Sequence, residues 1–96
     1  MEYTISFTSD PGHGWGCVEL RLLEKLGIAD KISEFSYQQS DGDPNTLVWL
    51  EEDCDLYLFV RAMREHGYEV KLDEQYVERT HIRGLPRYKY EKTVPV

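Results

Sequence analysis

Apolar and polar positions alternate strictly at the start of the chain. Tyr3, Ile5 and Phe7 are separated by threonine and serine, and this period of two predicts a half-buried strand. The turn sequence DPG at residues 10–12 should end the strand, because proline favours the second position of a type II turn and glycine tolerates the positive φ of the third. The glycine-rich segment 12–16 is compatible with either a hairpin or a strand-to-helix turn.

Two later segments have the 3.6-residue periodicity of amphipathic helices. The first apolar face consists of Val18, Leu22, Leu23 and Leu26. The second consists of Leu56, Phe59, Val60 and Met63. Gly27 and Gly67 follow these faces at the position where a left-handed residue ends a helix, with Ile28 and Tyr68 next to them, so both helices should end in a Schellman arrangement. Asp53 lies where its side chain can cap the second helix.

Alternating runs at residues 35–38 and 68–72, and the apolar run at residues 47–50, predict the remaining strands, and the last can continue as far as residue 80. The resulting element order is ββαββαβ. Hairpins interspersed with helices predict an α+β fold of two layers, a mainly antiparallel sheet with both helices on one face. We expect one domain over residues 1–80, followed by an extended basic C-terminal arm at residues 81–96.

Charge differs between the body of the chain and its end. The chain has 96 residues, which suits a single domain, and a net charge of −7. Residues 1–78 contain 17 acidic and 6 basic side chains, whereas residues 79–96 contain 1 and 5. The acidic body argues against general nucleic-acid binding. Because the sequence shows no signal-peptide pattern or membrane-spanning run, and its two cysteines are widely spaced, we expect a cytoplasmic protein without membrane contact.

An acidic cluster without any basic residue occupies positions 41–55. Its members are Asp41, Asp43, Glu51, Glu52, Asp53 and Asp55. Helix capping and complementation of the helix dipole explain part of the cluster. The remaining charge could imitate phosphates in front of a basic partner surface, so these residues are the predicted partner-binding site. An acid/base pair for hydrolysis is the alternative explanation.

The C-terminal arm combines cations with aromatic rings. The residues concerned are Arg83, Arg87, Tyr88, Lys89 and Tyr90. This composition is typical of a segment that stacks on bases and contacts phosphates. It equally suits an arm that docks on the acidic body of its own chain or of a second copy in a homodimer, and docking is the interpretation we prefer.

Two loops resemble ligand-binding motifs only in part. The glycines of segment 12–16 lack the spacing of a dinucleotide loop and the Gly-Lys-Ser/Thr of a P-loop, so a tight turn is expected there. Residues 41–52 place oxygen ligands as a calcium loop does, but Thr46 occupies the position that requires glycine. An ordinary polar hairpin loop explains that segment better.

Cysteine chemistry has weak support as well. Zinc would need Cys17, Cys54 and two histidines, and no closely spaced pair is present to anchor the ion. An enzyme built on His13 and Cys54 is a further alternative, but the acidic neighbours of Cys54 oppose thiolate formation. We therefore expect Cys54 to be a semi-buried structural residue, and predict neither a metal nor a cofactor.

Three segments resemble those of a group of small phage and prophage proteins of unassigned function: DPGHGW at 10–15, LGIADKIS at 26–33 and LEEDCD at 50–55. The resemblance covers roughly residues 3–90, with the 41–46 loop as an elaboration. It implies a phage-encoded accessory protein in a bacterial host, and supplies no catalytic residues. The expected function is non-enzymatic inhibition of a host or anti-phage defence protein with a basic surface, by analogy with other small acidic phage proteins.

Overall fold

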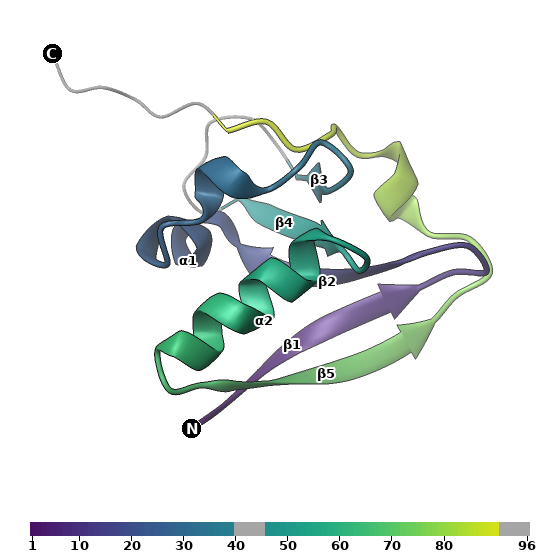
Figure 1. Ribbon diagram of the computed structural model, residues 1–96. Coiled ribbons are helices and arrows are strands. Elements are labelled where there is room, and N and C mark those ends of the chain that lie inside the picture. The colour runs from purple at the N-terminus through teal and green to yellow at the C-terminus, as the bar shows by residue number, and fades with distance from the viewer. Residues whose placement is uncertain (40–45, 91–96) are drawn as a thin grey trace, which may run out of the picture.

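A five-stranded sheet forms the centre of the structure, a computed structural model that describes residues 1–39 and 46–90 (Figure 1). The strands are β1 (Glu2–Ser9), β2 (Gly14–Glu19), β3 (Tyr37–Gln38), β4 (Leu47–Glu51) and β5 (Glu69–Tyr76). The helices are α1 (Leu20–Lys25) and α2 (Asp55–Glu65), with short 3-10 turns η1 (Ala29–Lys31) and η2 (His81–Gly84). The predicted α+β class and the order ββαββαβ are confirmed.

The sheet is mainly antiparallel, in the order β3-β4-β2-β1-β5. β1 and β2 form a hairpin, which settles the alternative left open for the glycine-rich segment. β4 pairs antiparallel with β2 and with β3, whereas β5 runs parallel to β1. This one parallel pair follows from α2, because a helical crossover brings the chain back to the sheet in the direction of β1. None of the helices in residues 1–39 and 46–90 is long and apolar enough to cross a membrane.

One face of the sheet packs against α2. Its buried side chains join those of both helices in a single apolar core: Ile5, Phe7, Val18, Leu23, Val48, Leu50, Leu56, Phe59, Ala62 and Met63. Gly14 and Gly16 belong to the same face, where a Cβ atom would lie 2.4 Å from the Phe7 ring and 2.8 Å from Leu56, respectively. Glycine at these two positions therefore lets the ring and the helix approach the backbone closely.

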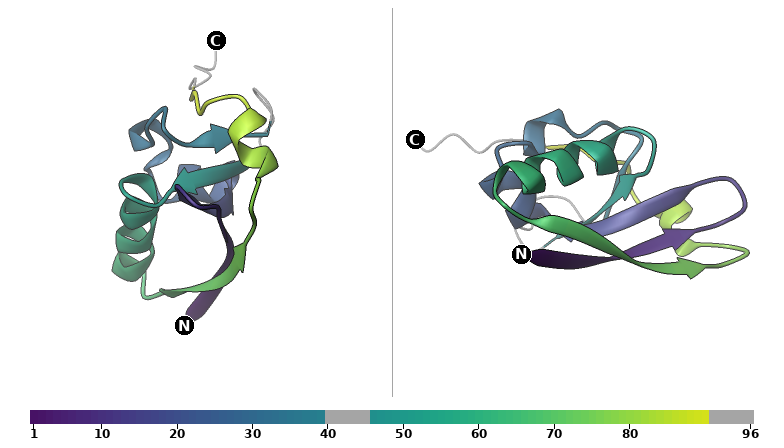
Figure 2. Two further views of the ribbon diagram at one scale, coloured as in Figure 1. Left: turned by 90° about the vertical axis from the view of Figure 1, so that its right-hand side faces the viewer. Right: turned by 60° about the horizontal axis from the view of Figure 1, so that its bottom comes forward.

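The opposite face is covered by η2 instead of a second long helix. The left view of Figure 2 shows α2 and η2 on opposite sides of the sheet. Ile82 of η2 is fully buried. Its two neighbours contact aromatic side chains of the sheet. The guanidinium carbon of Arg83 lies 5.2 Å from the Trp15 ring centroid, and the His81 ring meets the Trp49 ring edge-on. Residues just after the predicted domain boundary at residue 80 therefore pack against the same sheet as the residues before it.

The C-terminal arm docks on its own chain, as we preferred from the sequence. Tyr37 and Arg87 form an antiparallel bridge, the Gln38 N–H donates to Pro86 O at 2.9 Å, and the Tyr88 N–H donates to Ser36 O at 2.8 Å. The described part of the arm thus runs along β3 as an extra extended segment. It covers the sheet edge that β3 would otherwise expose.

Both helices end as predicted. Gly27 and Gly67 have φ values of +73° and +84°, and the residue after each donates to the carbonyl five positions earlier, as the Schellman arrangement requires. The first helix is shorter than its apolar pattern suggested, because Val18 belongs to β2 and α1 begins only at Leu20. Strand pairing with β4 thus outweighs the local helical period.

Three local predictions were wrong. Gly12 does not adopt a positive φ, so the turn is not type II; the Asp10 side chain shapes it by accepting the N–H groups of Gly12 and His13, both at 2.9 Å. The alternation at residues 35–38 is inverted, because Phe35 is 59% exposed whereas Ser36 is fully buried. Asp53 does not cap α2, whose cap residue Cys54 makes no side-chain capping bond.

Candidate functional site

A cavity of about 360 Å³ lies on the η2 side of the sheet. It is lined by His13, Trp15, Phe35, Tyr37, Glu51, Asp53, Cys54, Arg83 and Arg87. These residues come from the β1–β2 turn, the segment before β3, the strands β2, β3 and β4, the turn before α2, and the C-terminal arm. The cavity therefore brings together rings, carboxylates, guanidinium groups and a thiol that are distant in the sequence.

Aromatic rings in edge-on contact and two guanidinium groups form one wall of this cavity. Trp15 and Tyr37 meet edge-on with ring centroids 6.2 Å apart. The Arg87 guanidinium lies 5.4 Å from the Tyr37 centroid and donates to Glu34 O at 3.1 Å. Trp15 is only 2% exposed, and its indole Nε1 has no hydrogen-bond partner among residues 1–39 and 46–90. Such an unpaired donor is costly to bury, so it marks a place where an acceptor atom would be stabilised.

Arg83 is held at the cavity by Asp10. The Arg83 Nε and a terminal guanidinium nitrogen donate to the two carboxylate oxygens of Asp10 at 2.6 and 2.9 Å. This bidentate ion pair, together with the backbone N–H groups of Gly12 and His13, holds the pKa of the Asp10 carboxyl well below its usual range. The ion pair also raises the pKa of Arg83. The β1–β2 turn and the C-terminal arm are thereby joined at one point.

We expect Asp10→Asn to reduce stability in a pH-dependent way. Because the pKa of Asp10 is lower in the folded than in the unfolded protein, its contribution is fully present above the unfolded value of about 3.9 and disappears as the pH falls through the folded value. The melting temperature of the variant should therefore lie below that of the wild type at pH 7, and the difference should shrink below about pH 4. Circular dichroism melts from pH 7 to pH 2 measure this, with Asp73→Asn on the exposed strand β5 as the control. A difference that stays constant down to pH 2 would contradict the ion-pair explanation.

Glu51, rather than Asp53, binds backbone N–H groups in the turn before α2. Its carboxylate oxygens accept the backbone N–H of Asp53 at 3.0 Å and of Cys54 at 3.1 Å, immediately before α2. Glu51 is only 8% exposed. It therefore fixes the turn between β4 and α2 from inside the protein.

Asp55 is the second inward-facing member of the acidic cluster. It is 3% exposed, and its carboxylate accepts the Ser33 N–H and both the Ser33 and Ser36 hydroxyl groups. The Ser36 Oγ accepts in turn the N–H of Glu51 at 2.9 Å. Asp55 thus ties the segment before β3 to the start of α2.

The predicted acidic face is consequently smaller than the sequence suggested. Of the six residues, Asp41 and Asp43 lie outside the described residues, and Glu51 and Asp55 are buried and bonded within the protein. Glu52 and Asp53 are exposed. The part of the cluster that a partner can contact, within the described chain, consists of these last two.

The arm residues are engaged with the body of the protein. Arg83 and Arg87 line the cavity, whereas Tyr88 is 5% exposed and its hydroxyl donates to Ala29 O. The Lys89 N–H donates to the Gln38 side chain at 3.0 Å, and the Tyr90 hydroxyl to Glu24 at 3.0 Å. Tyr88 is therefore not available to stack on a nucleic-acid base in this arrangement.

The two residues of the enzyme alternative, His13 and Cys54, do line the same cavity. Cys54 is exposed, so the prediction of a semi-buried structural cysteine was wrong. Cys17 is the partly buried thiol, and burial raises its pKa.

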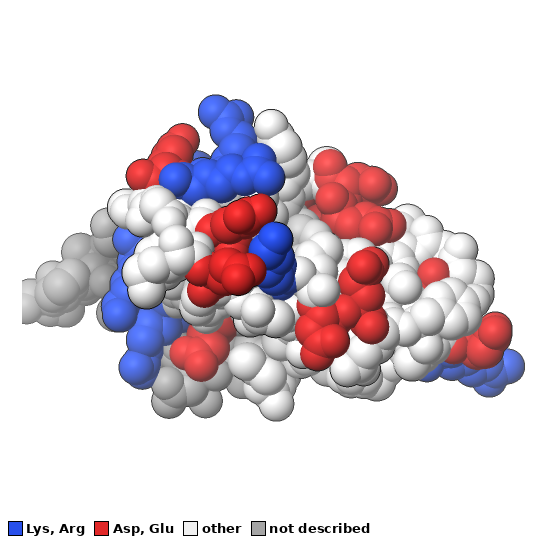
Figure 3. Space-filling model, turned by 90° about the horizontal axis from the view of Figure 1, so that it is seen from below, with Lys and Arg blue, Asp and Glu red and all other residues white. Residues whose placement is uncertain are grey.

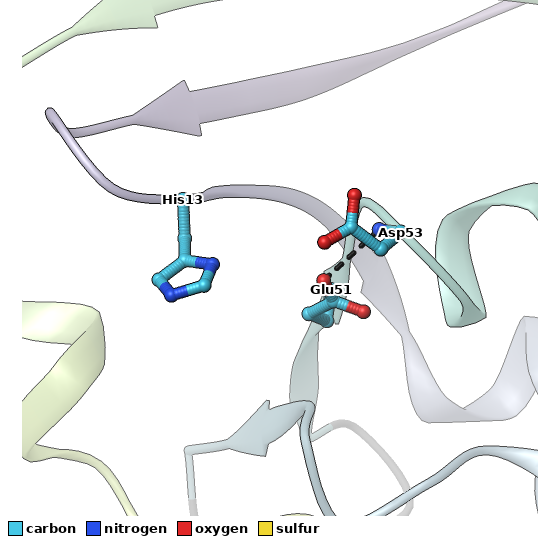
Figure 4. Close-up of side chains that lie close together, drawn as sticks. All are labelled: His13, Glu51 and Asp53. Atoms are coloured by element: carbon cyan, nitrogen blue, oxygen red, sulfur yellow. Dashed lines mark hydrogen bonds between the residues drawn. The ribbon is translucent and has the colours of Figure 1, made fainter.

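His13 also lies near two carboxylates, a proximity that spacing along the chain does not indicate. Figure 4 shows His13 in the turn before β2, Glu51 at the end of β4 and Asp53 in the turn that leads to α2. One possible ligand atom from each residue lies within 4.8 Å of the other two. The register of β2 and β4 produces this arrangement, because Trp15 pairs with Glu51 and His13 is only two residues before Trp15.

Comparison of the chain with protein-family models, with curated proteins and with solved structures finds no match.

Proposed function

We propose that this chain is a non-enzymatic binding protein that inhibits a host or anti-phage defence protein by occupying a basic, nucleic-acid-binding surface. The observation that supports this proposal is an aromatic cavity lined by the exposed carboxylate Asp53, with the exposed Glu52 next to Asp53 in the chain. Phe35 lines that cavity and is 59% exposed. An exposed ring beside charged groups is typical of a protein interface, in which the ring supplies the anchor and the charges form the rim.

The overall charge favours the same kind of partner. The chain has a net charge of −7, and Figure 3 shows several acidic patches, with basic side chains among them, on the face seen from below. A negative field of this kind attracts a positively charged surface over a distance of several ångströms and raises the association rate. The contacts of the arm point away from the alternative of nucleic-acid binding, since Arg83 is paired with Asp10 and Tyr88 is buried.

We expect the double charge reversal Glu52→Lys/Asp53→Lys to weaken partner binding about 10- to 100-fold, because it replaces two attractive contacts with two repulsive ones. Neither side chain makes a described contact that the fold depends on, so the variant should remain folded. Tagged protein is used to capture its partner from nuclease-treated host lysate, and the affinity of the recovered protein is then measured for wild type and variant at low and high salt. Wild-type affinity should fall with salt.

The matched control is Glu2→Lys/Glu65→Lys, which changes the net charge equally at the N-terminal end of β1 and the C-terminal end of α2. This control should retain most of the affinity. Equal losses in both double variants, or none in either, would show that the rim formed by Glu52 and Asp53 is not the binding site. Recovery of nucleic acid alone, lost after nuclease digestion, would support the arm as the binding segment instead.

A further inference from the structure

We propose that His13, Glu51 and Asp53 form a binding site for a divalent transition-metal ion of the Zn²⁺ class. The three residues come from separate parts of the chain and meet at the cavity described above. This inference does not rest on the proposed function, because it requires no partner protein.

The geometry needs only a small adjustment to bind a metal. One donor atom from each residue lies within 4.8 Å of the others. Ligands that bind zinc at about 2.0–2.2 Å stand about 3.5 Å apart in a tetrahedral site. Since His13 and Asp53 are exposed, their side chains can rotate inward by about an ångström, whereas Glu51 is buried and already fixed.

Two carboxylates are available to neutralise a cation at the site. Of the two guanidinium groups that line the same cavity, that of Arg83 is paired with Asp10 and that of Arg87 lies over the Tyr37 ring. Two carboxylates face the same small space, and within the described chain neither forms an ion pair with a basic side chain. The N–H groups of Asp53 and Cys54 use two of the roughly four lone-pair positions of Glu51, which orients the carboxylate and leaves room for a metal bond. Oriented ligands of this kind are typical of metal sites, in which hydrogen bonds hold the first ligands in place.

The donor set selects the type of metal. An imidazole nitrogen beside two carboxylates suits Zn²⁺ and its neighbours in the first transition row, whereas Ca²⁺ and Mg²⁺ prefer oxygen ligands alone. Three protein ligands leave a fourth position open, as in catalytic and ligand-binding zinc sites.

The test is a calorimetric titration of metal-free protein with ZnCl₂, carried out on a Cys54→Ser background so that the exposed thiol cannot bind the ion. We expect saturable binding of one ion per chain, and much weaker binding of Ca²⁺ and Mg²⁺. His13→Gln and Asp53→Asn should each weaken zinc binding about 10- to 100-fold or more, since even the loss of a hydrogen bond to a ligand has an effect of that size. Co²⁺ should give the absorption spectrum of a nitrogen- and oxygen-ligated site without a thiolate band.

The controls are His66→Gln, which removes another exposed histidine, and Glu52→Gln, which removes a neighbouring carboxylate; both should bind zinc as the wild type does. Absence of saturable binding, or equal binding by the His13→Gln variant, would overturn the proposal. Asp53 belongs to both proposals, so partner binding is also measured for two single variants: Glu52→Gln leaves all three proposed metal ligands in place, and His13→Gln removes a ligand without changing the exposed acidic pair.

Discussion

Replacing Asp55 with alanine should lower the free energy of unfolding by about 3–5 kcal/mol, because it removes a buried carboxylate that accepts one buried and two partly buried hydrogen bonds. The Asp55 carboxylate accepts the N–H and hydroxyl of Ser33 and the hydroxyl of Ser36. Asp55 is 3% exposed and Ser36 is fully buried, so water has little access to the bond between them. A domain of this size is typically stable by only about 5–15 kcal/mol, and urea denaturation followed by circular dichroism should therefore show a large shift.

Asp53→Ala is the matched control, since it makes the same change two residues earlier at an exposed position. We expect it to alter the free energy of unfolding by less than about 0.5 kcal/mol, as exposed substitutions usually do. If Asp53 were the cap of α2, the cost would instead be about 0.5–2 kcal/mol. Asp55→Asn keeps the volume and one acceptor oxygen and should lie between the two. Similar stability of the Asp53→Ala and Asp55→Ala variants would contradict the role assigned to Asp55.

Regular periodicity made much of the fold predictable from the sequence. The two long strands β1 and β5 and the helix α2 were recognised because each contains a run of apolar residues at one regular period. The end of α2 was equally clear, since Gly67 closes it by a local rule that needs no tertiary contact. Where two patterns competed, as at Val18, pairing between β2 and β4 decided the outcome, and that pairing is not visible in the local sequence.

The inverted burial of Phe35 and Ser36 has the same kind of cause. Local alternation places the aromatic ring inside, but the Ser36 hydroxyl is required inside because it links Asp55 to the N–H of Glu51. A buried carboxylate needs such donors, and they are taken from wherever the chain supplies them. Residue type and spacing in the sequence do not show which carboxylate will be buried or which side chains will donate hydrogen bonds to it.

The candidate site was only partly predictable for a related reason. Counting charges identified the acidic cluster, but it could not distinguish Glu51, which turns inward, from Glu52, which is exposed. The proximity of His13 to these residues depends on the register of β2 and β4. Predicting that strand pairing before considering the chemistry would have brought His13 and Glu51 together.

Tyr88→Ala should lower the free energy of unfolding by about 3–5 kcal/mol, the usual cost of removing a large buried aromatic side chain. Tyr88 belongs to the apolar core although it lies in the C-terminal arm, and its hydroxyl donates to Ala29 O. Burial raises the pKa of this hydroxyl, so it remains a protonated donor over the physiological range. Tyr88→Phe keeps the ring and loses only the hydrogen bond, and should cost about 1–3 kcal/mol because Ala29 O loses its partner.

The control is Tyr57→Ala, at a position on α2 where the ring is 61% exposed and the change should cost less than about 0.5 kcal/mol. The free energy of unfolding is measured by thermal and urea denaturation for the three variants, each made in the full-length chain. Comparing the losses distinguishes an arm that is docked on the protein from one that is free. A docked arm requires the order Tyr88→Ala, Tyr88→Phe, Tyr57→Ala from the largest loss to the smallest. If instead Tyr88→Ala were as stable as the wild type and reduced binding to a labelled oligonucleotide at low salt, residues 81–90 would act as a nucleic-acid-binding arm, and docking would be refuted.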